Sequence, residues 1–366
     1  MKMKSYKPYK KKFIGWLFTV PIILSIIGLF FVFEASSVRS FQEYGESFHY
    51  FKLQLIWIIL GIASMFFFSV FDYRKLYYFS LFFILGTIIL LTIVLIPGIG
   101  YSAGGARRWI DFGVINLQPT ELAKLSVIIY LSSWFVTRER KRFFSFLILL
   151  SILMLLIILQ PDMGTAIIVF AISIIIYFLA GIELWYLALL LPGAFALFLL
   201  LVRVAPYRFR RLLAFFDPTL DPLGITYHIN QILISLGSGG FLGQGFGASR
   251  QKYLYLPEAH TDSIFAIIGE EFGFVGTFLL ISLYLYLMYR IYQIALHASD
   301  RFGKLLAGGI LAFFNLQIII NLSGMVNLLP LTGVPLPFIS YGGSNLLISF
   351  MLIGILINIA KKSRLL

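Results

Sequence analysis

The polar residues best suited to chemistry lie in LPEAHTDSIFAIIGEE, residues 256–271, which leads into a long apolar run. Asp262 is the last ionisable residue before that run, and His260 and Thr261 stand beside it. An aspartate at this position is a good helix cap, and spacing alone favours that role. It is also a candidate general base at a membrane–water boundary, where partial burial raises the pKa of a carboxyl group.

A second polar segment, GYSAGGARRWIDFGVINLQPTE at residues 100–121, carries two adjacent arginines and an aromatic residue. Arg107 and Arg108 supply fixed positive charge, and Trp109 is suited to anchoring at a membrane interface. Paired arginines beside an aromatic ring suit a pyrophosphate and a sugar face. A segment that binds lipid headgroups would have the same composition, and both interpretations stay open.

Three further ionisable residues lie at or near the starts of predicted helices. Glu121 follows Pro119, a good first helical residue, and Lys124 lies three residues further on the same face, so the two can pair. Such a pair needs no function, but an ionisable residue inside an apolar span usually marks a functional cavity, and we favour that interpretation. Asp162 of QPDMGT is either a helix cap or a polar group at the rim of the bundle.

Glycines and prolines mark two segments that approach other parts of the chain. SGGFLGQGFG, residues 238–247, does not follow a strand in a βαβ unit, so a nucleotide-binding fingerprint is the wrong interpretation. Its glycines let the backbone lie close to a ligand or to another helix. The segment 328–347 has three prolines and a Gly-Gly pair, and it looks like a rigid re-entrant loop with Ser340 near its tip. Glu270 and Glu271 lie about 12 Å inside the predicted helix that follows Asp262, and they are expected to face a cavity or another helix.

All of these residues must be positioned by helices in a membrane. The 366-residue chain is 60% hydrophobic and only 12% charged, whereas soluble proteins carry about 25% charged residues. Apolar runs near the roughly 20 residues that a membrane helix needs occur at 13–33, 51–71, 77–98, 121–137, 143–160, 163–182, 184–203, 263–290, 304–326 and 345–360. The sequence therefore predicts a single-domain, all-α polytopic membrane protein of ten transmembrane helices. One large extracytoplasmic loop, 204–262, connects the seventh helix to the eighth.

The net charge of +13 indicates a topology rather than a nucleic-acid partner. Eighteen of the 29 lysines and arginines fall on one side if both ends of the chain lie inside, including those of the loop 138–142. The positive-inside rule then places the basic tail 1–12 and the tail 361–366 in the cytoplasm. The chain has no cysteine, so no disulfide framework exists. No cluster of carboxylates has the spacing of a dedicated metal site.

Several segments resemble the signature blocks of one protein family, and they occur in the family's order. They are GARRWID with QPTELAK, then QPDMGTA, DPLG, SGGFLGQGFG, SRQKYLYLPEAHTDSIFAIIGEEFGFVG and GVPLPFISYGGSNLL. On these blocks the chain resembles the SEDS family of bacterial cell-shape and division proteins from about residue 34 to the C-terminus. Four short sequences are more similar to those of the division members of the family than to those of the elongation members: ASS at 35–37, SRQK, PEAHTD and PFISYGG.

The resemblance implies a peptidoglycan glycosyltransferase of the bacterial cytoplasmic membrane. It implies polymerisation of lipid II beside a class B penicillin-binding protein and other proteins of the division or elongation machinery. The family's essential aspartate falls on Asp262. Residues expected to bind substrate, by family block or by position, are Arg107, Arg108, Trp109, Glu121, Lys124, Asp162, His260 and Ser340. His228, Ser263 and Asn345 depart from the family's pattern, and Ser263 bears on the packing around the aspartate.

These lines combine into one mechanism. Asp262 would deprotonate the 4-hydroxyl of the acceptor's N-acetylglucosamine, and that oxygen would attack the anomeric carbon of the donor's N-acetylmuramic acid with inversion. Undecaprenyl pyrophosphate would leave, with Arg107, Arg108 and Lys124 as candidates to neutralise it; a divalent cation, Mg or Mn, could share that task. A lipid II flippase, an elongation-type polymerase and a non-catalytic scaffold for the transpeptidase are the alternatives.

Overall fold

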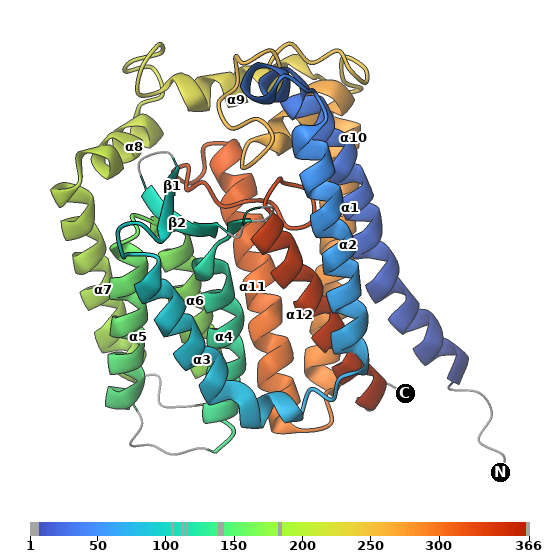
Figure 1. Cartoon of the computed structure of the whole chain (residues 1–366), viewed down its shortest axis with the longest axis vertical. Coiled ribbons are helices and arrows are strands. Elements are labelled where there is room, and N and C mark those ends of the chain that lie inside the picture. The colour runs from blue at the N-terminus through green and yellow to red at the C-terminus, as the bar shows by residue number, and fades with distance from the viewer. Residues whose placement is uncertain are drawn as a thin grey trace.

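A computed structural model describes residues 7–103, 106–111, 113, 116–137, 143–181 and 185–363. Gly104, Gly105 and the basic loop 138–142 lie outside these residues. The described part is a bundle of helices with one small sheet near one end (Figure 1). In chain order its elements are α1 (Lys7–Tyr44), α2 (His49–Val70), α3 (Lys75–Ile93), β1 (Gly100–Ala103), β2 (Ala106–Asp111), β3 (Asn116–Leu117), α4 (Pro119–Trp134), α5 (Phe143–Ile158), α6 (Met163–Leu179), α7 (Trp185–Val204), α8 (Pro206–Phe216), α9 (Tyr227–Ser238), α10 (Ile264–His297), α11 (Arg301–Met325) and α12 (Gly343–Lys362).

The helices follow the predicted apolar runs, and each of the ten runs contains one helix. Among the described helices, α1, α2, α3, α10, α11 and α12 are long and apolar enough to cross a membrane. Helix α7 with α8 makes a seventh candidate, bent by 103° between its two parts. Helices α5 and α6 are apolar but shorter, at 16 and 17 residues. The chain is therefore a predominantly helical, multi-span membrane protein.

Helix α12 forms the centre of the bundle. In the most apolar stretch of α12, 83% of the residues are buried, whereas in that of α3 only 28% are buried. The ring of Phe350 lies directly over Gly61 of α2, a close approach that a small residue permits. The Asn358 side chain donates to the Ser69 carbonyl at 3.1 Å and accepts from the Tyr73 amide at 3.1 Å. The end of α12 is thereby fixed to the turn between α2 and α3.

The polar segment 100–121 contains a small sheet, which the sequence did not predict. Strands β1, β2 and β3 pair antiparallel in that order, with Tyr101 opposite Trp109 and Ile110 opposite Leu117. Ala106 and Ile110 of β2 are buried, whereas Arg107 is exposed. The strands are too short to show a clear alternating pattern in sequence, which is why periodicity did not reveal them.

The segment predicted as one large loop, 204–262, contains α8 and α9. Helix α8 begins with Pro206 at its first position, a residue that is favoured there because its missing N–H is not needed. Its sequence, PYRFRRLLAFF, places arginines and apolar residues on different faces. In Figure 1, α8 and α9 lie at one end of the bundle, and the C-terminal end of α12 lies at the opposite end.

Helix α10 is broken at Gly273, whose φ of 60° is not helical. A break frees carbonyl groups before it and amide groups after it, and these groups need partners inside a membrane protein. The segment 239–247 supplies them. Two of its amides donate to the carbonyls of Glu270 and Glu271 at 3.0 Å each, and two of its carbonyls accept from the amides after the break at 2.9 and 3.1 Å.

Glycines permit this contact between the segment 239–247 and α10. A Cβ added at Gly243, which has a φ of +83°, would lie 2.1 Å from the carbonyl oxygen of Glu271. One added at Gly239 would lie 2.0 Å from the carbonyl oxygen of Gly269. The sequence predicted that this segment lies close to a ligand or to another helix, and in the structure it lies against helix α10.

A non-helical stretch, the re-entrant segment of residues 326–342, connects α11 to α12. Its residues Leu336, Phe338 and Ile339 are buried in the bundle, as irregular backbone at membrane depth must be. The Asn321 side chain of α11 donates to the carbonyls of Val334 and of Asp262, both at 2.9 Å. One amide group thus joins the re-entrant segment to the backbone that precedes α10.

Candidate active site

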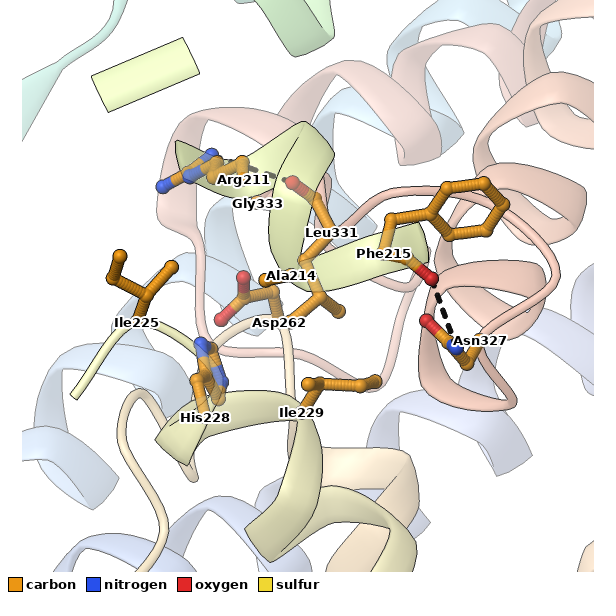
Figure 2. Close-up of a pocket in the computed structure, with 10 residues that line it drawn as sticks. All are labelled: Arg211, Ala214, Phe215, Ile225, His228, Ile229, Asp262, Asn327, Leu331 and Gly333. Carbon is orange, nitrogen blue, oxygen red and sulfur yellow. Dashed lines mark hydrogen bonds between the residues drawn. The ribbon is translucent and has the colours of Figure 1, made fainter. Parts of the chain in front are cut away.

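A cavity of about 130 Å³ contains the candidate base Asp262 (Figure 2). It is formed by α8, by α9 and the loop before it, by Asp262, which lies two residues before α10, and by the re-entrant segment. The residues that line it are Arg211, Ala214, Phe215, Ile225, His228, Ile229, Asp262, Asn327, Leu331 and Gly333. Apolar side chains are combined here with three ionisable ones, an arrangement typical of binding sites. The fourth polar side chain, that of Asn327, donates to the Phe215 carbonyl at 3.3 Å (Figure 2).

The Asp262 carboxylate is not a helix cap. Ser263 is the residue at the cap position of α10, and its side chain makes no capping bond. The Asp262 Oδ1 atom accepts a bond from the Thr261 hydroxyl at 3.2 Å. Capping, which spacing alone favoured, is therefore wrong for this residue, and the carboxylate is available to the cavity.

The environment of Asp262 makes its carboxyl group a better base than a free aspartate. Burial raises the pKa of Asp262 to about 6, and the negative charge of Glu258 acts in the same direction. A hydrogen bond from its own backbone amide, the positive charge of Arg211 and the hydrogen bond from Thr261 act in the opposite direction. A pKa close to neutral is the range in which a general base is most effective.

Arg211 and His228 are the other ionisable residues that line the cavity. Arg211 of α8 donates to the Leu331 carbonyl at 3.4 Å. His228 of α9 lies 2.8 Å from the Ser263 hydroxyl through Nε2. Burial, with the nearby charge of Arg211, lowers the pKa of His228 to about 4, so its ring is neutral near pH 7. The cavity thus combines a carboxylate, a fixed positive charge and a neutral imidazole.

The residues predicted from the segment 100–121 do not line this cavity. Arg107 is exposed, and Trp109 is partly buried. The Arg108 guanidinium donates to the carbonyls of Gln160 and Pro161, which fastens the small sheet to the turn between α5 and α6. This contact gives Arg108 a structural role in the described part of the chain, and its binding role stays a prediction.

Glu121 and Lys124 form the predicted ion pair, at 2.7 Å, and both are buried. Asn345 of α12 donates to the second carboxylate oxygen of Glu121 at 2.9 Å. The Lys124 ammonium also lies 5.5 Å from the centre of the Phe313 ring. The pair joins α4 to α12 inside the bundle and does not line the cavity around Asp262. A part in substrate binding remains a prediction.

Asp162 is a helix cap, which was one of its two predicted roles. Its carboxylate accepts from the Thr165 amide at 3.1 Å at the start of α6. It also accepts from Gln118 at 3.2 Å and from Thr120 at 3.3 Å, and so holds the start of α4. These bonds position the starts of α4 and α6, and Asp162 does not line the cavity around Asp262.

His260 and Ser340 are buried in contacts with the protein. The His260 ring contacts those of Tyr50 and Tyr341, at centroid distances of 4.7 and 5.6 Å, and these two rings also contact each other at 5.2 Å. Burial lowers the pKa of His260 to about 4. The Ser340 hydroxyl accepts from the Leu336 amide at 2.8 Å and stabilises the re-entrant segment. Neither residue lines the cavity.

Glu270 and Glu271 are buried, but mainly against the loop after the segment 239–247 and not against a cavity; the predicted contact with another helix is limited to the bond that Glu270 accepts from Ser235 of α9 at 3.3 Å. Glu270 accepts from the Ser249 hydroxyl at 2.6 Å and from the Arg250 amide at 3.1 Å. Glu271 accepts from the Ser249 amide at 3.3 Å. Both carboxylates therefore hold the chain that leads to Asp262.

Sequence reasoning missed Arg211 and gave His228 no role. The available signals were the separation of arginines and apolar residues in PYRFRRLLAFF and the position of both residues in the one large polar segment. Within the described residues, no three His, Asp or Glu side chains group closely enough to hold a metal ion.

The fold and this cavity define a class of protein. It is a multi-span membrane protein in which short amphipathic helices cover a carboxyl group whose pKa is close to neutral. The pattern that defines the FTSW_RODA_SPOVE family of cell cycle proteins matches residues 15–365, so the chain belongs to this family. A probable peptidoglycan glycosyltransferase FtsW of Geobacter metallireducens is 38% identical over 349 residues, covering 94% of this chain and 93% of the relative. Stage V sporulation protein E of Bacillus subtilis is 38% identical over 354 residues, covering 95% and 97%.

Solved structures have the same fold. A chain of a peptidoglycan synthase complex, described for its structural coordination of polymerization and crosslinking, superimposes with a TM-score of 0.76 at 26% identity. The match covers 94% of this chain and 96% of that one. The rod shape determining protein RodA of Thermus thermophilus gives a TM-score of 0.70 at 25% identity, covering 95% and 96%. The resemblance drawn from the sequence is therefore confirmed.

Proposed function

We propose that this chain is a peptidoglycan glycosyltransferase that polymerises lipid II, with Asp262 as its general base. Family membership and the names of the relatives support the activity. The observation that carries the assignment of the base is the state of the Asp262 carboxylate. It lies in a cavity, it is not used as a helix cap, and its pKa is raised to about 6.

The reaction proceeds by attack of the acceptor's sugar hydroxyl on the donor's anomeric carbon. Asp262 removes the hydroxyl proton as the new C–O bond forms, and the bond to undecaprenyl pyrophosphate breaks with inversion at that carbon. General base catalysis contributes a factor of about 10² to 10⁴. The remaining acceleration comes from holding two lipid-anchored substrates in line and from neutralising the leaving pyrophosphate.

Arg211 is the cation best placed to interact with the leaving group. It lines the same cavity as Asp262, whereas Lys124 is committed to a buried ion pair. A guanidinium group keeps its charge at all working pH values and can bind two phosphate oxygens at once. Arg107 and Arg108 remain candidates for a later contact with the pyrophosphate or with lipid headgroups.

We also propose the predicted topology and partner. The helices of the ten predicted apolar runs, α1–α7 and α10–α12, cross the membrane, and both termini lie in the cytoplasm, as the positive-inside rule requires. In Figure 1 the start of α1 and the end of α12 lie at the same end of the bundle, opposite α8 and α9, and this supports the arrangement because α8 and α9 line the Asp262 cavity. A class B penicillin-binding protein is the proposed partner, because the similar chain of known structure belongs to a synthase complex.

The substitution Asp262→Asn tests the base. Asparagine has nearly the same size, and no capping bond is lost, so folding is preserved. We expect polymerisation of lipid II by the purified chain with its partner to fall by at least about 10²-fold. In the unaltered protein the rate should rise with pH through about 6, because only the deprotonated carboxyl group accepts a proton.

Asp217→Asn is the matched control, since Asp217 is an exposed aspartate of the same 204–262 segment whose carboxylate contacts only Thr219 in the described hydrogen bonds. It should polymerise normally. A near-normal rate for Asp262→Asn would show that this residue is not the base, and transport or scaffolding would then account better for the fold.

A further inference from the structure

The two oxygens of the Asp262 carboxylate face different surroundings. Oδ1 accepts a bond from the Thr261 hydroxyl at 3.2 Å. Oδ2 lies toward Gly333, which lines the cavity, since a Cβ added to that glycine would be 3.6 Å from it. One oxygen therefore faces the space open to a substrate, and the other faces back along the chain that precedes α10.

The Thr261 hydroxyl connects Asp262 to a second carboxylate. Its oxygen lies 2.9 Å from Glu258 Oε2 and 3.2 Å from Asp262 Oδ1. A hydroxyl group can accept a proton from one neighbour while it donates its own proton to another. The Glu258 side chain is 51% exposed, so a proton that reaches it can pass to water.

The turn at Glu258 holds these groups in line. Its carbonyl accepts from the amides of Thr261 at 3.1 Å and Ser263 at 3.2 Å. Its Oε1 atom lies 3.7 Å from Arg39 Nη1, which leaves Oε2 directed to Thr261. Arg39 is itself held by Glu43 of α1 at 2.8 Å. The glutamate is thus fixed by its own backbone and by α1.

We propose that Thr261 and Glu258 form the path by which the proton leaves Asp262 after glycosyl transfer. The proposal rests on the proposed function, because it requires Asp262 to be the base. Rotation about the Cβ–Cγ bond presents the newly bound proton to Thr261 Oγ1. The hydroxyl proton of Thr261 passes at the same time to Glu258 Oε2, and Glu258 releases it to water. Asp262 is then a carboxylate again.

Such a path matters because the substrates occupy the cavity side of Asp262. While the new glycan and the pyrophosphate remain there, bulk water cannot collect the proton at Oδ2. The chain behind the carboxylate stays accessible through the exposed Glu258 side chain. Release through Thr261 therefore lets the base recover before the product leaves.

The charges around Asp262 give each member of the path a different effect on the pH profile. The negative charge of Glu258 raises the pKa of Asp262, whereas the Thr261 bond and Arg211 of α8 lower it. His228 of α9 is neutral near pH 7, and the re-entrant segment adds no ionisable group to the cavity lining. Loss of the glutamate charge and loss of the threonine hydroxyl therefore shift the acidic limb in opposite directions.

The test measures lipid II polymerisation by the full chain with its partner between about pH 5 and pH 8. We expect Glu258→Gln to move the acidic limb to lower pH and Thr261→Val to move it to higher pH. Both should lower the plateau rate by about tenfold, a fraction of the factor that proton transfer typically contributes. Thr261→Ser keeps the hydroxyl group and should keep the plateau.

Glu46→Gln is the matched control for charge. Glu46 is a comparably exposed carboxylate, at 45%, whose partner is Lys52 at 2.8 Å and which does not contact Thr261 in the described hydrogen bonds. Its removal should change neither the plateau nor the limb. Any effect seen only at Glu258 then belongs to its position next to Thr261.

Normal plateau rates in both Glu258→Gln and Thr261→Val would overturn the path. A Thr261→Ser variant as slow as Thr261→Val would do so too, because the hydroxyl group would then not be the conducting group. Asp262→Asn in the same assay separates the two levels. If it is inactive while the path variants are normal, only the path fails; if it is active, the proposed function fails with it.

Discussion

The break in α10 predicts a clear difference between two glycine substitutions in the segment 239–247. A Cβ at Gly243 would lie 2.1 Å from the carbonyl oxygen of Glu271, a backbone atom that cannot move aside alone. A Cβ at Gly245 would meet no atom within 4 Å. Both glycines have a positive φ, +83° and +103°, so the two sites share the conformational cost and differ in the steric one.

The magnitudes follow from these contacts. Alanine at Gly245 carries only the cost of a positive φ, about 1–2 kcal/mol. Alanine at Gly243 adds an overlap worth about 1–3 kcal/mol and the loss of at least one bond across the break, worth about 1 kcal/mol. The expected losses of unfolding free energy are therefore about 1–2 kcal/mol at Gly245 and about 3–6 kcal/mol at Gly243.

Thermal unfolding of the purified variants in detergent, together with lipid II polymerisation, measures both consequences. Gly243→Ala should melt well below Gly245→Ala. It should also lower the polymerisation rate, because α10 begins two residues after Asp262 and a displacement of about 1 Å costs about 10²-fold. Equal melting temperatures and equal rates for the two variants would refute the idea that close backbone contact at Gly243 supports the break.

Two further predictions concern buried groups. Lys124→Met leaves Glu121 without its ion-pair partner and should lower the free energy of unfolding by about 3–5 kcal/mol, whereas the double variant Glu121→Gln/Lys124→Met should recover much of the loss; equal stabilities of the single and double variants in chemical unfolding would contradict this. Burial lowers the pKa of His260 from 6.5 to about 4, so its contribution to stability is present above about pH 6.5 and is lost as the pH falls toward 4. Unfolding curves of His260→Phe should depend less on pH in that window than those of the unaltered protein, and identical pH dependences would count against it.

The helices could be predicted well because one constraint determines them. The hydrocarbon thickness sets the length of each apolar run, and the runs in this chain are interrupted by charged or Pro- and Gly-rich segments. Helix α1 shows the limit of that signal, since it continues beyond the apolar run to Tyr44. Its polar extension is stabilised by contacts with distant residues, such as the ion pair between Glu34 and Lys252, which no local pattern reveals.

The site was only partly predictable for the same reason. Asp262 stands out because it is an acid at the start of a long apolar helix. Arg211 reaches its cavity because the chain bends by 103° between α7 and α8, and His228 reaches it from α9, a separate helix further along the chain. Such a bend depends on tertiary packing. Local reasoning gave the pairing of Glu121 with Lys124 correctly, but it could not show that this pair lies inside the bundle rather than at the cavity.

The burial of α12 has a consequence for how the protein is made. This helix follows in chain order every helix against which it packs, yet it fills the centre of the bundle. During synthesis the earlier helices enter the bilayer first, with the surface around Gly61 and the Ser69 carbonyl still facing lipid. They must keep a space among themselves, or separate again, until α12 is inserted. Interruption of translation shortly before residue 343 would therefore leave the surface that α12 covers exposed to lipid.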